Sequence, residues 1–260
     1  MELNIEGRAR KDILDAALSA GPAGAHIGPS LSMVEIALAC MDEMADGDKF
    51  ILSKGHGALG YYAAMHQSKK ITDEQFATFE QNGGEFPGQP KRGKTNGIDY
   101  SSGSLGMGLS YAAGLAYANR NNFYYVVLGD GELNEGSVWE SAGLIKQHGL
   151  ANVIAIVDYN GLQSEGRTVD IVGMNLQAIF KGYGWRVIEC NGHAMDELKQ
   201  SIETAKNSKS VPFVIFAHTV KGKGVPFMEN NNEWHHHELS QEKYGFAMGE
   251  IGKRYGLCEK

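Results

Sequence analysis

The sequence predicts an α/β fold with three layers, in which a parallel sheet carries helices on both faces. Two continuous apolar runs, at residues 123–128 and 152–157, indicate buried parallel strands. Between them, Val138, Ala142 and Ile145 recur at helical spacing. A strand, a helix and a second strand in this order form a βαβ unit, from which parallel sheets are built.

Further elements extend this pattern along the chain. The helix of the βαβ unit covers about residues 134–148. Strand candidates lie near 185–189 and 212–217, with a helix near 195–207 between them, and a last helix begins at about Gln241. We therefore expect the parallel sheet to continue through the second half of the chain.

Local signals mark helix starts and one long loop. The pairs Ser32/Glu35 and Thr72/Gln75 both resemble capping boxes, in which two side chains satisfy the free amides of a helix start. Residues 82–104 are rich in Gly, Pro, Asn and Ser and predict a long loop. Loops of this length in a compact domain are often functional.

The length and charge narrow the class of protein. At 260 residues and 28.2 kDa, the simplest expectation is a single domain over residues 1–260, and an apolar content of 42% is ample for its core. The net charge of −7 and the pI near 5.7 argue against nucleic acids and anionic membranes as partners.

The cysteines and the N-terminus indicate a cytoplasmic protein. Cys40, Cys190 and Cys258 are scattered and odd in number, which disfavours a disulfide framework or a zinc ribbon. The first residues are too charged for a signal peptide. No apolar run approaches the roughly 20 residues that a membrane-spanning helix needs.

Polar residues follow the two central strands at the points where these strands end. Asp130 lies between Gly129 and Gly131 after the first strand, and Asn160 follows the second. In open parallel sheets, ligands bind at this edge. Taken separately, both motifs are typical of ordinary turns.

Together, the two motifs favour a metal–diphosphate site. The Asp130 carboxylate, the Asn160 amide and the backbone carbonyl near Leu162 are oxygen ligands of the kind that Mg²⁺ or Ca²⁺ prefers. Phosphate oxygens would complete the shell. Glycine at 129 and 131 lets the backbone approach a phosphate closely.

Five segments resemble motifs of the transketolase family, in the order of that family. Residues 129–166 (GDGELNEGSVWESAGLIKQHGLANVIAIVDYNGLQSEG) resemble its thiamine-diphosphate motif. The others are similar to two N-terminal histidine segments, a glycine-rich segment and a closing segment: GPAGAHIGPSLSMVEIALA (21–39), DKFILSKGHGALGYYAA (48–64), SSGSLGMGLSYAAGLAYA (101–118) and TVKGKGVPFMENNNEWHH (219–236).

The resemblance implies a Rossmann-like fold that binds thiamine diphosphate, and transfer of a two-carbon ketol unit between sugars in carbohydrate metabolism. It implies Mg²⁺, with Ca²⁺ or Mn²⁺ as alternatives, on Asp130, Asn160 and Leu162. It implies catalytic histidines at 26, 56 and 236 and substrate contacts from His26 and Gln89. The cofactor-binding residues implied by it are His56, Gly103, Leu105, Gly129, Asp130, Gly131, Asn160, Leu162 and His236.

The resemblance also implies a partner. Transketolases have three domains, and this sequence matches only the first. The domain that holds the aminopyrimidine ring of the cofactor, with the glutamate that activates it, has no counterpart here. We therefore expect no activity from this chain alone. We expect a separate C-terminal transketolase subunit that carries this glutamate, in a two-plus-two heterotetramer.

Two other features leave alternatives open. His236 aligns with a family histidine that glycine usually follows, but here His237 follows, so His235 or His237 could take that role. Three consecutive histidines cannot easily surround one zinc ion tetrahedrally. Lys221 could approach a phosphate, although its sequence context is more typical of a solvated surface lysine.

The main departure from the family pattern is Gln89, which stands where the family usually has a histidine that contacts donor hydroxyl groups. A glutamine forms hydrogen bonds but carries no proton at neutral pH. This departure favours an unusual ketose donor or, as an alternative activity, acyl or acyloin transfer from a 2-oxo acid. A third hypothesis is a non-catalytic subunit that binds diphosphate or serves in assembly.

Overall fold

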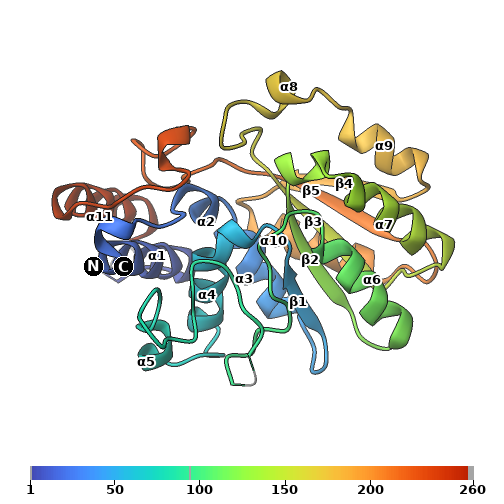
Figure 1. The fold of residues 1–260 in the computed structure, drawn as a ribbon, viewed down its shortest axis with the longest axis horizontal. Coiled ribbons are helices and arrows are strands. Elements are labelled where there is room, and N and C mark those ends of the chain that lie inside the picture. The colour runs from blue at the N-terminus through green and yellow to red at the C-terminus, as the bar shows by residue number, and fades with distance from the viewer. Residues whose placement is uncertain (1, 94, 257–260) are drawn as a thin grey trace.

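A single parallel sheet organises the chain (Figure 1). Within residues 2–93 and 95–256, which the computed structural model describes, five strands pair in the order β1-β2-β3-β5-β4. All four pairings are parallel. The strands are β1 (Lys49–Leu52), β2 (Tyr124–Gly129), β3 (Val153–Tyr159), β4 (Arg186–Asn191) and β5 (Phe213–His218).

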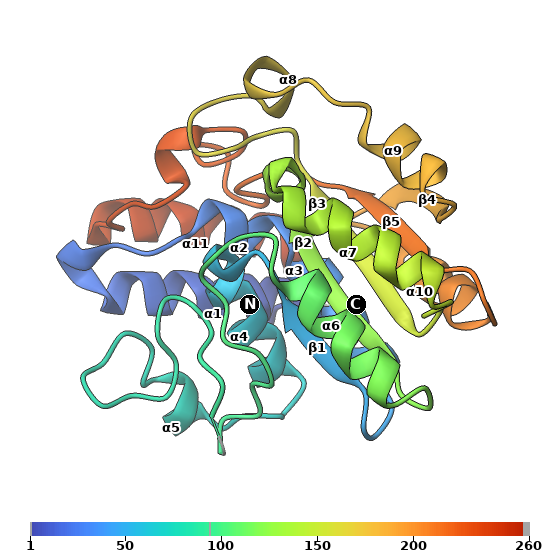
Figure 2. The ribbon, with the colours of Figure 1, turned by 45° about the vertical axis from the view of Figure 1, so that its right-hand side comes forward.

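Helices cover both faces of the sheet, as Figure 2 shows from a second direction. The core on one face contains side chains of α1 (Ile5–Ser19), α3 (Val34–Glu43), α4 (Ala58–Gln67), α10 (Met195–Lys206) and α11 (Gln241–Tyr255), and α11 packs on α1. The other face packs on α6 (Gly108–Ala118), α7 (Gly136–Gln147) and α9 (Leu176–Gly182). Three short helices, α2 (Gly28–Ser32), α5 (Asp73–Phe76) and α8 (Thr168–Ile171), lie in connections.

Successive residues of the central strands point to opposite faces and so build two cores. Val127 and Ile156 belong to the core under α1, α3 and α4, whereas Val126 and Ala155 belong to the core under α6 and α7. All four side chains are fully buried. This two-sided burial explains why the strands are continuously apolar, and it confirms the predicted three-layer α/β fold.

Three local expectations differ from the structure. β1 was not anticipated as a strand, because its four residues are too few for a clear pattern. The helix after β2 begins at Gly136, since a 3-10 turn occupies residues 131–134. Thr72 and Gln75 do form a capping box, but Ser32 does not: its hydroxyl donates to Pro29 O and to Asp158 instead.

The carboxyl ends of the strands place the site. β2 and β3 are in register, so Gly129 pairs with Asp158, and the loops that carry Asp130 and Asn160 leave the sheet side by side. No helix in the described ranges is long and apolar enough to cross a membrane.

Candidate active site

Asp130 connects the two loops after β2 and β3 through hydrogen bonds to both. One oxygen of its carboxylate accepts a hydrogen bond from the Gly131 amide at 2.7 Å, and the other accepts one from the Gly161 amide at 2.5 Å. Asn160 Oδ1 accepts from the Leu162 amide at 3.1 Å. Asp130, Asn160 and Leu162 therefore line the same cavity, of about 250 Å³.

The Asp130 carboxylate lies in an unfavourable electrostatic position. Its burial, and next the nearby negative charge of Asp158, raise its pKa to about 6, although the amides of Gly161 and Gly131 oppose this shift. A bound cation would relieve this strain. In the described part of the chain, no three His, Cys, Asp or Glu side chains are grouped to hold a metal by themselves.

Two buried lysines bring positive charge to a cavity that Asp130, Glu132 and Glu135 also line. Lys54 is only 1% exposed, forms an ion pair with Asp158 and donates to Pro29 O at 3.0 Å. Lys221 is 2% exposed and donates to Gln163 O at 3.0 Å. Burial, followed by the Lys54 charge, lowers the pKa of Lys221 to about 8. The expectation of a solvated Lys221 was therefore wrong.

Unsatisfied polar atoms concentrate in this cavity. Among the described residues, five side chains have a buried polar atom without a hydrogen-bond partner, and three of the five line the cavity: Asn134, Gln163 and His235. Buried polar atoms are normally paired, so each unpaired one needs a reason. A polar ligand would supply that reason, and two lysine ammonium groups beside the Asp130 carboxylate suit an anion that carries a metal cation.

Glu132 connects the glycine-rich segment to the end of β2. This buried carboxylate accepts hydrogen bonds from the Ser53 hydroxyl, the Gly106 amide at 2.7 Å and the Gly129 amide at 3.0 Å. Gly106 has a φ of 80°, and a Cβ there would lie 2.7 Å from the Glu135 side chain. Leu105 is thereby held at the cavity wall.

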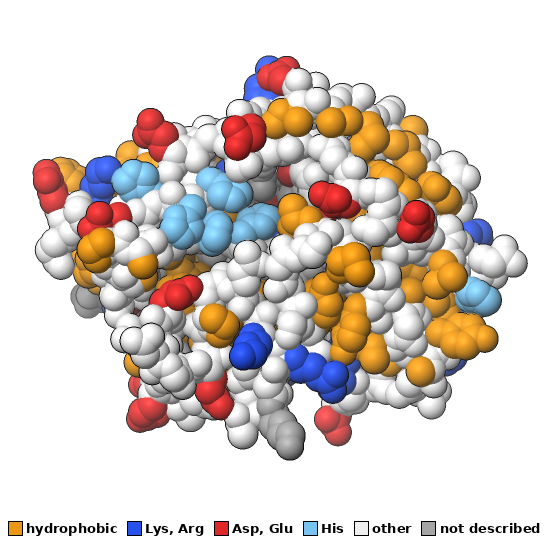
Figure 3. Space-filling view, in the orientation of Figure 1, with side chains coloured by type: hydrophobic (Ala, Val, Ile, Leu, Met, Phe, Trp, Pro, Cys, Tyr) orange, Lys and Arg blue, Asp and Glu red, His pale blue; other side chains and the backbone are white. Residues whose placement is uncertain are grey.

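Four histidines form a cluster beside the cavity, and Figure 3 shows histidines gathered on this face of the molecule. The ring of His26 lies 4.5 Å from that of His236, 5.5 Å from that of His235 and 6.0 Å from that of His56. The rings of His56 and His235 are 5.2 Å apart. The tertiary structure thus joins three segments that are distant in sequence.

Burial, with help from nearby positive charges, lowers the pKa of three of these imidazoles. Burial, and then the His236 ring, lower the pKa of His26 to about 4. Burial, and then Lys221, lower that of His235 to about 3. Burial and the Lys54 charge place the pKa of His56 well below its usual value. An anionic ligand would raise all three, because it offsets the lysine charges.

A second, smaller cavity collects the predicted substrate residues. His26, Gln89 and His236 line this cavity of about 190 Å³, together with Glu80. Gly103 lies near it: a Cβ there would be 3.5 Å from Gln89 Oε1. The other predicted cofactor residues line the first cavity, which includes His56, Leu105, Gly129, Asp130, Gly131, Asn160 and Leu162.

The three consecutive histidines point in different directions. His235 lines the first cavity and His236 the second. His237 stacks on Trp234 at 4.7 Å, and its backbone pairs with that of Ala25. His236, predicted to contact the cofactor, therefore does not line the first cavity, and its neighbour His235 lies there instead.

Sequence reasoning missed six residues of the first cavity. They are Pro29, Lys54, Glu132, Asn134, Gln163 and Ser164. The only available signal was position: Lys54 precedes the Gly-His-Gly motif, and Glu132, Asn134, Gln163 and Ser164 lie within four residues after Asp130 or Asn160.

Comparison with known proteins identifies the family. Residues 22–256 match the family model described as transketolase, thiamine diphosphate binding domain. The chain is 36% identical over 246 residues to one of the apulose-4-phosphate transketolase subunits of Actinobacillus succinogenes, with 88% of each protein covered. It is 34% identical over 243 residues to the 6-deoxy-6-sulfo-D-fructose transketolase subunit SqwG of Clostridium sp. strain MSTE9, again with 88% of each covered.

Solved structures agree. The transketolase of Campylobacter jejuni superposes with a TM-score of 0.86 at 26% identity, covering 97% of this chain. The chain spans 43% of that solved protein. The chain belongs to the transketolase family and matches its thiamine diphosphate-binding domain.

Proposed function

We propose that this chain is the N-terminal subunit of a transketolase that transfers a two-carbon ketol unit from a ketose donor to an aldose acceptor. The observation that carries the proposal is the first cavity. It joins Asp130 and Asn160 to two buried lysines at the carboxyl ends of parallel strands, and it holds three unpaired polar atoms. A metal-bound diphosphate would pair with the two lysine charges and would give the three unpaired polar atoms hydrogen-bond partners.

The residues present fit thiamine diphosphate with Mg²⁺. The metal would be held by the side chains of Asp130 and Asn160 and by the Leu162 carbonyl, with Ca²⁺ and Mn²⁺ as alternative ions. Lys221 and His235 would face the phosphates, together with Gln163. When bound, the cofactor supplies the stabilised carbanion on which ketol transfer depends.

The second cavity is where we place the donor sugar. His26, Gln89 and His236 present two imidazoles and an amide, which bind hydroxyl groups by donating and accepting hydrogen bonds. His26 lies between the two cavities, 4.5 Å from His236 and 6.0 Å from His56. We therefore assign proton movement at the donor hydroxyl and carbonyl to His26, with His56 as its neighbour on the cofactor side.

We further propose that the partner is a C-terminal transketolase subunit, in a two-plus-two heterotetramer. Large apolar side chains are exposed on and near α6, α7 and α8, on the face with orange patches in Figure 3. They are Met107, Tyr117, Leu144, Val169, Ile171, Val172 and Tyr183. Exposed apolar surface of this kind marks protein interfaces. The relatives in Actinobacillus and Clostridium are named as subunits, which supports a partner chain.

The proposal also covers the domain organisation and the location of the protein. We propose that residues 1–260 form one diphosphate-binding domain, since the two cores share a single sheet. We propose a cytoplasmic location, because Cys40 and Cys190 are buried free thiols rather than disulfide partners.

Gln89 favours one second candidate, acyl or acyloin transfer from a 2-oxo acid. Gln89 stands in the second cavity, where the family histidine would contact the hydroxyl groups of a ketose. A donor without those hydroxyl groups would have less need of that histidine.

The test is assembly followed by a donor screen. The chain is co-expressed with a transketolase-like C-terminal chain encoded beside it, and the purified complex is sized by light scattering. Donors are then compared: xylulose 5-phosphate, apulose 4-phosphate, 6-deoxy-6-sulfofructose, hydroxypyruvate and pyruvate. Ketol transfer from a ketose supports the proposal, turnover of pyruvate alone supports the second candidate, and a complex that binds no thiamine diphosphate rejects both.

A further inference from the structure

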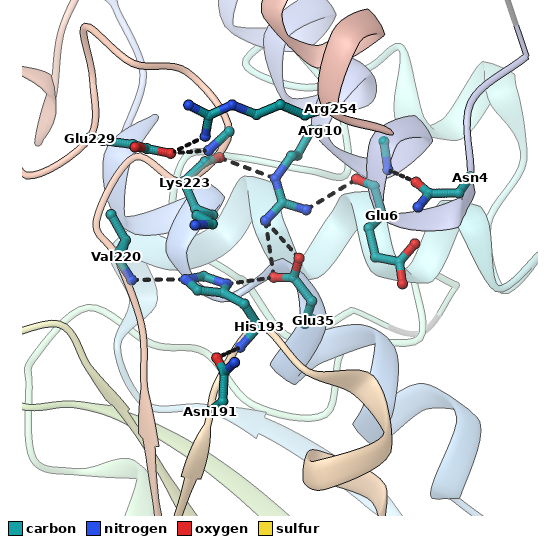
Figure 4. Close-up of polar contacts among 12 residues, drawn as sticks. Asn4, Glu6, Arg10, Glu35, Asn191, His193, Val220, Lys223, Glu229 and Arg254 are labelled. Atoms are coloured by element: carbon teal, nitrogen blue, oxygen red, sulfur yellow. Dashed lines mark hydrogen bonds and ion pairs between the residues drawn. The ribbon is translucent and has the colours of Figure 1, made fainter. Parts of the chain in front are cut away.

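A buried charged cluster lies outside both cavities (Figure 4). Arg10 of α1 is fully buried, and Glu35 of α3 is 2% exposed. Arg10 Nη2 lies 2.8 Å from Glu35 Oε1 and 3.0 Å from Oε2. His193, in the turn between β4 and α10, contacts Glu35 Oε2 through Nδ1 at 3.0 Å. Three segments of the chain thus converge on one carboxylate.

Both partners of Glu35 also bind one short backbone segment. His193 Nε2 accepts a hydrogen bond from the Val220 amide at 2.8 Å, so the ring is neutral and its Nδ1–H donates to Glu35. Arg10 Nε donates to Lys223 O at 3.1 Å. Val220 and Lys223 flank Lys221. The cluster therefore holds the backbone on either side of the lysine that enters the first cavity.

The path of this segment leaves little freedom. Gly222 has a φ of 79°, and a Cβ there would lie 2.3 Å from Met228 O. The Gly222 amide donates to Gly28 O at 3.0 Å, and Lys221 O accepts from the Asn230 amide at 2.8 Å. A lysine side chain is long and flexible, so the position of its ammonium depends on how firmly its backbone is fixed.

Stability alone is a weak reason for such a cluster. Removing charges from water costs free energy, and apolar residues of similar volume often stabilise a core equally well. Glu35 nevertheless stays ionised: burial favours its neutral form, but the Arg10 charge and the His193 hydrogen bond together lower its pKa. Apolar replacements could not form the hydrogen bonds to the Val220 amide and the Lys223 carbonyl, on either side of Lys221.

We propose that Glu35, acting through Arg10 and His193, is a positioning residue that fixes the Lys221 ammonium for the cofactor diphosphate. This inference rests on the proposed function of the first cavity. None of the three residues lines that cavity. Their effect on cofactor binding therefore passes through Lys221, and it disappears when Lys221 is removed.

A double-mutant cycle on the purified assembly tests this dependence, with thiamine diphosphate affinity measured by calorimetry in saturating Mg²⁺. Lys221→Met weakens binding about 10- to 100-fold, the range for a hydrogen bond to a charged group. His193→Phe keeps a ring but removes both hydrogen bonds, and weakens binding about 3- to 10-fold. In the Lys221→Met background, His193→Phe has no further effect on affinity.

Three further variants separate positioning from folding. His193→Gln, which can still donate and accept, restores most of the affinity. His218→Phe removes a half-exposed histidine that pairs with Glu189, and leaves affinity unchanged. Glu35→Gln keeps the shape of the side chain. If His193→Phe does not fold, Glu35→Gln replaces it in the double-mutant cycle with Lys221→Met.

The outcomes distinguish a failure of the positioning role from a failure of the proposed function. If His193→Phe and Glu35→Gln lower the melting temperature but leave affinity unchanged, the cluster is merely structural and the inference is overturned. Equal losses of affinity with and without Lys221 also overturn it. If the wild-type assembly binds no thiamine diphosphate, the proposed function fails, and the inference fails with it.

Discussion

The two ends of the sheet each carry a cavity and a buried aspartate, but only one end has the character of a binding site. At the carboxyl ends of the strands, Asp130 lines a cavity of about 250 Å³. At the amino ends, Asp48 lines a larger one of about 410 Å³. Asp48 accepts hydrogen bonds from the Phe123 amide at 2.7 Å and the Ala45 amide at 3.0 Å.

The two cavities differ in whether their buried polar groups have hydrogen-bond partners, and this difference matters more than their volumes. Among the described residues that line the cavity at the amino ends, no buried side chain has an unpaired polar atom. The smaller cavity has three such atoms, two buried lysines and an aspartate whose pKa is raised to about 6. Unpaired groups and displaced pKa values mark functional sites because folding alone would not keep them. The volume of a cavity is a poorer guide.

The largest expected effect comes from exchanging the two aspartates for asparagine, one at a time. Asp130→Asn removes a charged metal ligand and weakens Mg²⁺-dependent thiamine diphosphate binding by about 100-fold or more. Asp48→Asn leaves the affinity unchanged. Calorimetric titration of both variants measures this. Wild-type affinity in Asp130→Asn would remove the metal assignment.

The pH dependence of binding sharpens the same contrast. If Asp130 holds the metal, Mg²⁺ and a proton compete for its carboxylate, whose pKa burial and the Asp158 charge raise to about 6. Affinity therefore falls as pH falls below about 6, by about tenfold per unit. Titrations from pH 5 to 8 measure this slope. The terminal phosphate of the ligand also titrates, and the residual binding of Asp130→Asn records that contribution alone. Identical slopes in both proteins would contradict the prediction.

A smaller effect distinguishes the neighbouring histidines. His235→Ala removes a side chain from the metal–diphosphate cavity and weakens cofactor binding by about 5- to 10-fold, as expected for one lost hydrogen bond to a charged group. His236→Ala leaves cofactor affinity nearly unchanged and instead raises the KM of the donor, since His236 lines the second cavity. The reverse pattern would assign the family role to His236.

The smallest effect on cofactor affinity is expected from Gln89→His. Gln89 lies outside the first cavity, so thiamine diphosphate binding should not change. The restored imidazole should shift donor preference toward ordinary ketose phosphates by about 3- to 10-fold in kcat/KM, the worth of one hydrogen bond. Competition between two donors measures the ratio. An unchanged preference would show that Gln89 does not determine specificity.

The sequence by itself determined the fold class and the edge of the sheet at which the first cavity lies. Continuous apolar runs are a local property, and they predicted β2 and β3 because both faces of these strands are buried. The positions of Asp130 and Asn160 could be predicted because each residue directly follows the end of one of these strands. The transketolase motifs could also be read directly, since each occupies consecutive residues.

Only the tertiary structure decided which side chains meet. Lys221 looked solvated in its glycine-rich context, but segments far away in sequence bury it in the cavity. Lys54 pairs with Asp158 across 104 positions, and His193 binds Val220 across 27. Whether His235 or His236 lines the first cavity depends on how the closing segment packs on Ala25. Periodicity describes neighbours along the chain, whereas burial and charge depend on neighbours in space.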